Sequence, residues 1–232
     1  ELEVTDSDVG SVLECLRSGW LTMGPRTQAL EEAIAEMVGT EHAIVVSSGT
    51  AALHLACRSL GLGEGDKVIV PAFTFVATGL AVLHAGAVPV FVDIEPKTWG
   101  LDPDLVERAI TPATKAVMPV HMHGTPCELD ALLELCEDRK LILIEDAAQA
   151  HGATHRGRKI GTFGQLGCFS VQSSKSMPAG EGGLVVTDSE DLWAKCNRAR
   201  MFGENFRLED EASYRIERAL DGSRAYDSLS MG

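Results

Sequence analysis

Residues 141–149 read LILIEDAAQ, and this stretch decides the fold class. Four apolar residues in a row, ended by charged ones, are typical of a short strand that is buried on both faces. Glu145 and Asp146 follow at the point where such a strand ends. Because ligands of parallel sheets bind beyond the carboxyl ends of the strands, residues at this position are the first to consider for a chemical role.

Further apolar runs of the same kind lie before and after this one, and stretches with helical apolar spacing separate them. Strand alternating with helix predicts a mostly parallel sheet with helices on both faces, which is a three-layer α/β fold. We expect one large domain over residues 27–202, an N-terminal segment over 1–26 and an exposed connecting segment over 203–232. The predicted strands are 43–47, 67–71, 88–93, 115–120, 141–145, 167–171 and 184–188, and the predicted helices are 27–38, 50–60, 75–85, 103–110, 129–138 and 189–200.

The chain of 232 residues carries 20 basic and 34 acidic side chains, a formal net charge of −14. So acidic a surface repels phosphate backbones and anionic lipid heads, and we therefore expect neither nucleic acid nor a membrane as a partner. No apolar run approaches the roughly 20 residues of a membrane span. The start shows no secretory signal and no initiator Met, from which we expect a trimmed N-terminus. Six scattered cysteines without a Cys-x-x-Cys pair are expected to be free thiols of a cytoplasmic protein, not disulfides or metal ligands.

The turn after the first predicted strand reads SSGTAAL over residues 47–53. Unpaired amides and the positive end of the helix dipole make a helix N-terminus suited to an anion such as a phosphate. Gly49 would let the backbone come close to that anion, and Thr50 would add a hydroxyl. An ordinary helix cap explains the same residues, since Ser and Thr cap helices in many proteins.

Asp146 and Lys175 each allow two interpretations. A buried carboxylate needs a cation or a strong donor, and a protonated pyridine nitrogen would serve, although a helix-capping Asp fits equally well. Lys175 lies five residues after Ser170 in a loop of small residues, where partial desolvation would favour the neutral amine that attacks an aldehyde. Glycines at 180, 182 and 183 would let the backbone of this loop approach a ligand. A loop lysine is otherwise a solvated surface charge.

Phe75 follows the second predicted strand and could stack on a planar ring or simply belong to the core. The features gain weight as a set, because each follows a predicted strand and all would meet at one edge of the sheet. Together they provide an anion cradle, a stacking face, a partner for a ring nitrogen and an imine-forming amine, which are the requirements of pyridoxal phosphate. The sequence therefore predicts a site for this cofactor that contains Lys175 and Asp146.

Several segments continue this pattern in a fixed order. They are GWLTMGP (19–25), SGTAAL (48–53), GDKVIVP (65–71), TF (74–75), GAVPVFVD (86–93), VHMHG (120–124), EDAAQA (145–150) and GEGG (180–183). Together they resemble the DegT/DnrJ/EryC1/StrS family of sugar aminotransferases, which are fold-type I pyridoxal-phosphate enzymes. The resemblance runs over about residues 19–202 and implies the large domain of that fold, with one antiparallel strand near 184–188 in an otherwise mostly parallel sheet.

The resemblance implies a role for each residue of the predicted site. Lys175 would hold pyridoxal phosphate as a Schiff base and shuttle protons, and Asp146 would keep the pyridine nitrogen protonated. Gln149 would contact the hydroxyl side of the ring, and Phe75 would stack on the ring. The phosphate would be held by Gly49, Thr50, Ala51 and Ser170.

The reaction that the resemblance implies is transamination from glutamate or glutamine to a ketone of a sugar or cyclitol, in amino-sugar or secondary-metabolite biosynthesis. A PLP-dependent dehydratase or an aromatising synthase of the aminoshikimate type is an alternative, because the same cofactor contacts serve these reactions. A catalytically silent domain that keeps the fold is a third. The family also implies a homodimer, and its members continue into a smaller C-terminal domain, which we expect this chain to lack.

Overall fold

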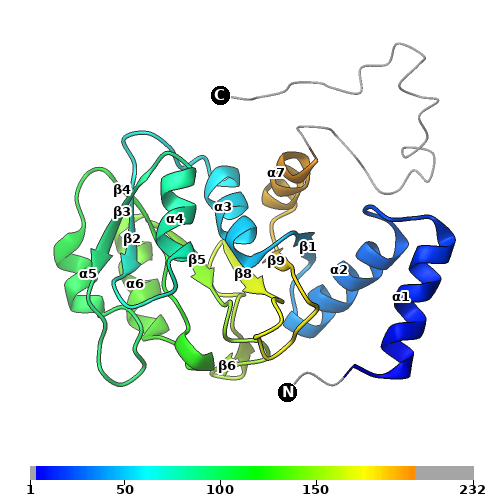
Figure 1. Cartoon of the computed structure of the whole chain (residues 1–232). Coiled ribbons are helices and arrows are strands. Elements are labelled where there is room, and N and C mark those ends of the chain that lie inside the picture. Colours follow the sequence, from blue (N-terminus) through cyan, green and yellow to red (C-terminus); the bar gives the residue numbers. More distant parts are fainter. Residues whose placement is uncertain (1–3, 202–232) are drawn as a thin grey trace, which may run out of the picture.

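The computed structural model describes residues 4–201, and Figure 1 shows a central sheet with helices packed around it. The predicted connecting segment at 203–232 lies outside the described residues. The helices are α1 (Asp6–Ser18), α2 (Pro25–Val38), α3 (Gly49–Ser59), α4 (Ala77–His84), α5 (Pro103–Ala109), α6 (Leu129–Arg139) and α7 (Glu190–Arg200), with a 3-10 turn, η1 (Met122–Gly124). The strands are β1 (His42–Val46), β2 (Lys67–Pro71), β3 (Val88–Val92), β4 (Thr114–Val117), β5 (Ile142–Asp146), β6 (Thr154–His155), β7 (Arg158–Lys159), β8 (Leu166–Ser170) and β9 (Gly183–Thr187).

The seven-stranded sheet has the order β1-β9-β8-β5-β4-β2-β3. Strand β9 runs antiparallel to both of its neighbours, β1 and β8, whereas the pairs from β8 to β3 are all parallel. The predicted antiparallel strand at 184–188 is therefore confirmed, and it begins one residue earlier, at Gly183. Since β1, β8, β5 and β2 share one direction, their carboxyl ends lie at one edge of the sheet, and the predicted site residues follow them there.

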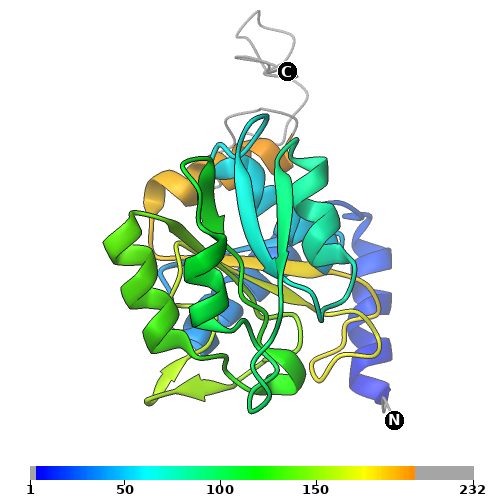
Figure 2. The same cartoon turned by 90° about the vertical axis from the view of Figure 1, so that its left-hand side faces the viewer.

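Two apolar cores, one on each face of the sheet, hold the three layers together. Helices α2, α5 and α6 cover one face, where Leu132 of α6 is fully buried, and α3, α4 and α7 cover the other, where Val82 of α4 is fully buried. Successive strand residues divide between the cores: in β5, Leu143 joins the first and Ile144 the second. Figure 2 shows the same layers turned by 90°. The predicted three-layer α/β fold is confirmed.

Some predicted strand properties differ from the structure. The fourth strand ends at Val117 and not at 120, because Pro119 has no amide hydrogen to continue the ladder. Burial on both faces is wrong for β3, which lies at the edge of the sheet and exposes Val88 and Phe91 by 49% and 59%. An edge strand has a neighbour on one side only, so fewer side chains cover it.

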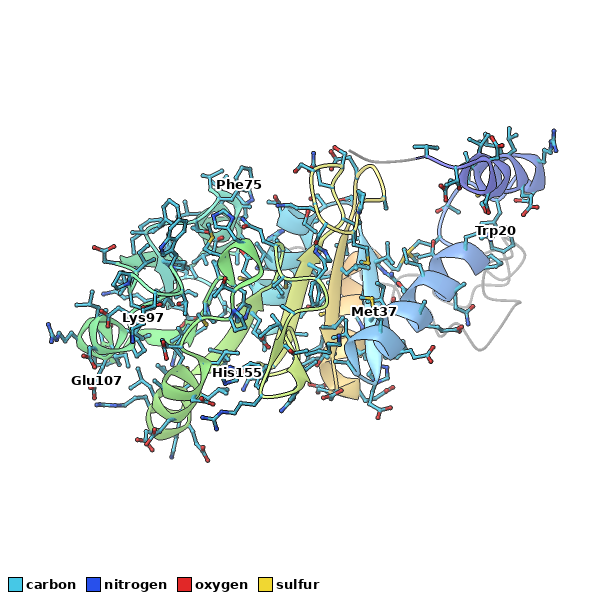
Figure 3. All side chains as sticks on the ribbon, turned by 90° about the horizontal axis from the view of Figure 1, so that it is seen from below. Trp20, Met37, Phe75, Lys97, Glu107 and His155 are labelled. Atoms are coloured by element: carbon cyan, nitrogen blue, oxygen red, sulfur yellow. The ribbon has the colours of Figure 1, made fainter. Side chains whose placement is uncertain are left out.

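Helix α1 and the β6–β7 hairpin were not predicted. Helix α1 begins with a capping box in which Thr5 and Asp8 bond reciprocally, and this was the signal in the sequence that could have found it. None of its residues is buried. In Figure 3 it lies apart from the sheet, and Trp20 marks the turn that joins it to α2.

Within residues 4–201, no helix is both long and apolar enough to cross a membrane. All six cysteines are free thiols, as their scattered spacing predicts, and five of them are buried. Burial raises the pKa of Cys57 to about 12 and that of Cys136 to about 11, so both stay protonated near neutral pH.

Candidate functional site

Asp146 ends β5 with its side chain almost fully buried, only 4% exposed. Thr78 Oγ1 donates to its Oδ2 at 2.8 Å, and the Ala148 amide donates to its Oδ1 at 3.2 Å. Burial raises the pKa of this carboxyl above its ordinary value near 3.8, while the two hydrogen bonds and the charge of Lys175 oppose that rise. A cation placed against these oxygens would offset the cost of burying the charge.

Thr78 ties Asp146 to the loop that carries Phe75. Its hydroxyl has one proton, which goes to Asp146, so Thr74 must donate to Thr78 across the 2.8 Å between their Oγ1 atoms. Thr78 is fully buried in α4, whereas Phe75, three positions earlier, is 68% exposed. Figure 3 shows Phe75 near the surface of the molecule. The ring therefore lies on a loop anchored to the buried carboxylate, with its surface open to a planar ligand.

The anion cradle predicted at residues 47–53 forms where β1 turns into α3. Ser48 caps the helix: its Oγ accepts the Ala51 amide at 3.1 Å, and its carbonyl accepts the Ala52 amide at 3.0 Å. The amides of Gly49 and Thr50 precede these bonds, so they remain available to an anion at the positive end of the helix dipole. The ordinary cap and the anion cradle are therefore not exclusive here.

Glycine is required at this turn because Ser170, the last residue of β8, lies against Gly49. A Cβ at Gly49 would lie 2.7 Å from the Ser170 Cβ. Gly183 is the first residue of β9, which lies between β1 and β8. A Cβ at Gly183 would lie 2.1 Å from the Ser48 carbonyl oxygen. The sequence interpretation gave Gly183 to a ligand, but the structure shows it accommodating neighbouring backbone. These glycines bring the Ser170 hydroxyl to the end of α3.

Gln149 is held by the turn at η1. Its Oε1 accepts the backbone amide of His123 at 2.9 Å, which leaves its Nε2 to donate to a ligand. His123 reaches this position with a φ of +52°, in the left-handed region that residues other than glycine seldom adopt. Such local strain is commonest at binding and catalytic sites.

Lys175 is half-buried in the loop after β8, where its amide donates to the Gln172 carbonyl at 2.9 Å. Its charge acts on both Asp146 and His151: burial lowers the pKa of His151, and Lys175 lowers it further. His151 also ties the loop back to the β5 side, because its Nδ1 lies 3.1 Å from Ser176 Oγ. The lysine loop is thus anchored beside the segment that carries Asp146.

The structure therefore brings the predicted residues to one edge of the sheet, on separate loops and turns. The polar groups fit pyridoxal phosphate: hydroxyl and amide donors for a phosphate, a buried carboxylate as acceptor for a ring N–H cation, and an amide donor for a ring hydroxyl. A hollow of about 1460 Å³ along α2, α3 and α7 shares only Ala51 with the predicted site. Polar chemistry, rather than the size of a cavity, marks the candidate site.

Sequence reasoning missed Thr78 and gave Glu145 no role of its own. Thr78 lies 68 positions from the carboxylate to which it donates. The contact exists because α4 packs over the sheet, and a buried threonine in an apolar helix carries no signal of it in a single sequence. The adjacent carboxylate pair at 145 and 146 was the signal in the sequence that could have found Glu145.

Comparison with known proteins gives one family. The DegT/DnrJ/EryC1/StrS aminotransferase family model matches residues 3–219. GDP-perosamine synthase of Caulobacter vibrioides is 45% identical over 190 residues, which cover 82% of this chain and 51% of that protein. The chain spans about half the length of the curated relatives it matches.

Solved structures give the same result. DesV of S. venezuelae matches with a TM-score of 0.83 and 43% identity, over 86% of this chain and 54% of its own. The 3-amino-5-hydroxybenzoic acid (AHBA) synthase matches with a TM-score of 0.84 and 38% identity, over 91% and 56%. Both are longer chains that share this fold over about half their length.

The buried Asp146 yields a prediction about stability. A carboxyl group with a raised pKa binds its proton more tightly in the folded chain than in the unfolded chain. Its contribution to stability is therefore complete below about pH 3.8 and is lost as the pH rises through the pKa of the folded state. We expect Asp146→Asn, without cofactor, to unfold at higher urea concentration than wild type at pH 7, and this gain to shrink toward pH 4. Glu134→Gln, exposed on α6, should keep the pH dependence of wild type. Equal stability of Asp146→Asn and wild type at pH 7 would show that the carboxylate carries no burial penalty.

Proposed function

The chain belongs to the DegT/DnrJ/EryC1/StrS aminotransferase family, and we propose that it forms the cofactor-binding part of a pyridoxal-phosphate-dependent sugar aminotransferase. The proposed reaction moves an amino group from glutamate or glutamine to a ketone of a sugar or cyclitol. The observation that carries the proposal is the buried Asp146 carboxylate, which is destabilised without a cation and lies within the electrostatic reach of Lys175. The names of two relatives, GDP-perosamine synthase and a spore coat polysaccharide biosynthesis protein, support the sugar class.

When bound, pyridoxal phosphate supplies a ring that accepts electrons from a substrate carbon. Asp146 would hold a proton on the ring nitrogen, since its buried charge is stabilised by a cation and is already oriented by Thr78. Gln149 would donate its free Nε2–H to the ring hydroxyl, because its Oε1 is occupied by the His123 amide. Phe75 would cover one face of the ring.

The phosphate would lie at the N-terminus of α3. The amides of Gly49 and Thr50 and the Ser170 hydroxyl would donate to its oxygens, and the helix dipole would favour its negative charge. The Ala51 amide already donates to Ser48 Oγ, so a phosphate would share it. Lys175 Nζ would anchor the cofactor by condensing with its aldehyde, with loss of water. Once displaced by the substrate amine, the free Lys175 amine would remove and return the substrate proton.

The role of Lys175 is tested by substitution. We expect the whole protein, reconstituted with pyridoxal phosphate, to show a visible absorption band that Lys175→Ala abolishes, because Lys175 would supply the amine that anchors the cofactor. Lys97→Ala removes an exposed lysine and should leave the band intact. A band of equal intensity in Lys175→Ala would refute the assignment.

An aromatising synthase is a second candidate, and the similarity to AHBA synthase favours it. The cofactor contacts described here serve both reactions, since substrate contacts choose which bond is broken. The amino-acid product separates the two. We expect incubation with glutamate or glutamine and a keto-sugar to release a 2-oxo acid in proportion to the aminated product. Turnover of the acceptor without any 2-oxo acid would support the synthase or dehydratase instead.

The whole protein is further proposed to be a homodimer. Phe73, Phe75, Val76 and Trp99 are between 45% and 68% exposed, and exposed apolar groups of this kind are typical of an interaction surface. We expect sedimentation velocity of the whole protein at micromolar concentration to give twice the mass of one chain. A monomer would contradict the proposal.

A further inference from the structure

Next to Asp146 the structure holds a second buried carboxylate that the proposed chemistry does not use. Glu145 is fully buried, as is the imidazole of His121, and His121 Nε2 lies 3.1 Å from Glu145 Oε2. The other partners of Glu145 are backbone amides of the loop before β8: Gly161 at 2.9 Å on Oε2, and Phe163 and Gly164 at 2.6 and 2.8 Å on Oε1. A carboxylate offers about four acceptor positions, and here all are filled.

The hydrogen bonds also determine the tautomer of His121. Its Nδ1 accepts the Cys127 amide at 3.3 Å, so the ring proton is on Nε2, which donates to Glu145. Every polar side-chain atom of the pair thus has a partner.

The pair is connected to Asp146 through the backbone. The His121 amide donates to the Asp146 carbonyl at 3.1 Å, and the Asp146 amide donates to the Pro119 carbonyl at 3.0 Å. Adjacent strand residues face opposite sides of a sheet, so Glu145 is fastened to the loop at 161–164 while Asp146 meets Thr78 on the other side. The end of β5 is therefore held from both faces at the residue that would meet the cofactor.

We propose that the His121–Glu145 pair is a positioning unit, which holds the carboxylate of Asp146 in the place and orientation that the ring nitrogen requires. The proposal rests on the proposed function above, because it assigns the pair a purpose in binding the cofactor. A purely structural pair would stabilise the fold without influencing the bound ring. The two alternatives therefore predict different effects on the affinity and the absorption of the bound cofactor.

The test uses variants of the whole protein loaded with pyridoxal phosphate. In Glu145→Gln an NH₂ group replaces one carboxylate oxygen. In one orientation it faces the amides of Phe163 and Gly164, and in the other it faces the Gly161 amide and the His121 ring. All of these groups donate, so two donors face each other in either orientation. His121→Leu removes the donor to Glu145 and the acceptor for the Cys127 amide. His121→Gln can retain both bonds and serves as the conservative variant.

Cofactor affinity and the pH midpoint of the visible band are the readouts. We expect Glu145→Gln and His121→Leu to weaken cofactor binding about tenfold, as for residues that orient metal ligands. We also expect both to move the midpoint, because the charge on the ring nitrogen depends on Asp146. His121→Gln should remain close to wild type. If His121→Leu does not fold, Glu145→Gln and His121→Gln decide the question.

A matched control separates positioning from stability. Glu31 and Arg200 form a buried ion pair, with side chains 10% and 8% exposed, between α2 and α7. Both bond to the backbone of Val45 in β1, which lies three strands away from β5 in the sheet. Glu31→Gln should lower the melting temperature without moving the pH midpoint of the band. The positioning role would be rejected if Glu31→Gln moved the pH midpoint as far as Glu145→Gln does. It would also be rejected if folded Glu145→Gln kept the midpoint and the cofactor affinity of wild type. Neither outcome would affect the proposed function. A wild-type protein without a Lys175-dependent band would instead overturn the proposed function, and this inference with it.

Discussion

The rest of the site depends on the burial of one carboxylate, that of Asp146. An apolar central strand must lie between two helical layers, and its last side chain therefore emerges where little water reaches it. Hydrogen bonds from Thr78 and Ala148 reduce the cost of the charge but supply no cation. A fold that accepts such a penalty gains a preoriented acceptor, which is the usual exchange of stability for function at a binding site.

The same edge of the sheet shows how topology and chemistry constrain each other. Strand β9 runs antiparallel between β1 and β8. Its first residue, Gly183, therefore lies between the carboxyl ends of these two strands. Gly183 and Gly49 keep that space free of side chains, and the Ser170 hydroxyl and the amides of α3 consequently face one small region. A methyl group at either glycine would push the Ser170 hydroxyl away from the amides of α3, so these donors could not bind one anion together.

The carboxylates at 145 and 146 show how one strand end serves two purposes. Because neighbouring residues of a strand face opposite sides, Asp146 meets Thr78 on one side while Glu145 is bound by loop amides and His121 on the other. The family match covers this region within residues 3–219, and the similar structures share the fold around it. Side chains on opposite faces do not compete for the same partners, so the four bonds of Glu145 and the Thr78 bond of Asp146 coexist at one strand end.

The sequence by itself determined the layer architecture and the candidate residues. Apolar runs such as 141–145, and the amphipathic helical stretches between them, can bury their apolar surface only in a sheet covered by helices on both faces. The polar residues that follow the parallel strands then lie at one edge of that sheet. The tertiary structure alone decided the partners: the bond from Thr78, the tautomer of His121, and the contact between Gly49 and Ser170. These link positions far apart in the chain, and they depend on packing distances that local spacing does not encode. Periodicity is a local property, whereas the burial and pairing of a charge are properties of the whole fold.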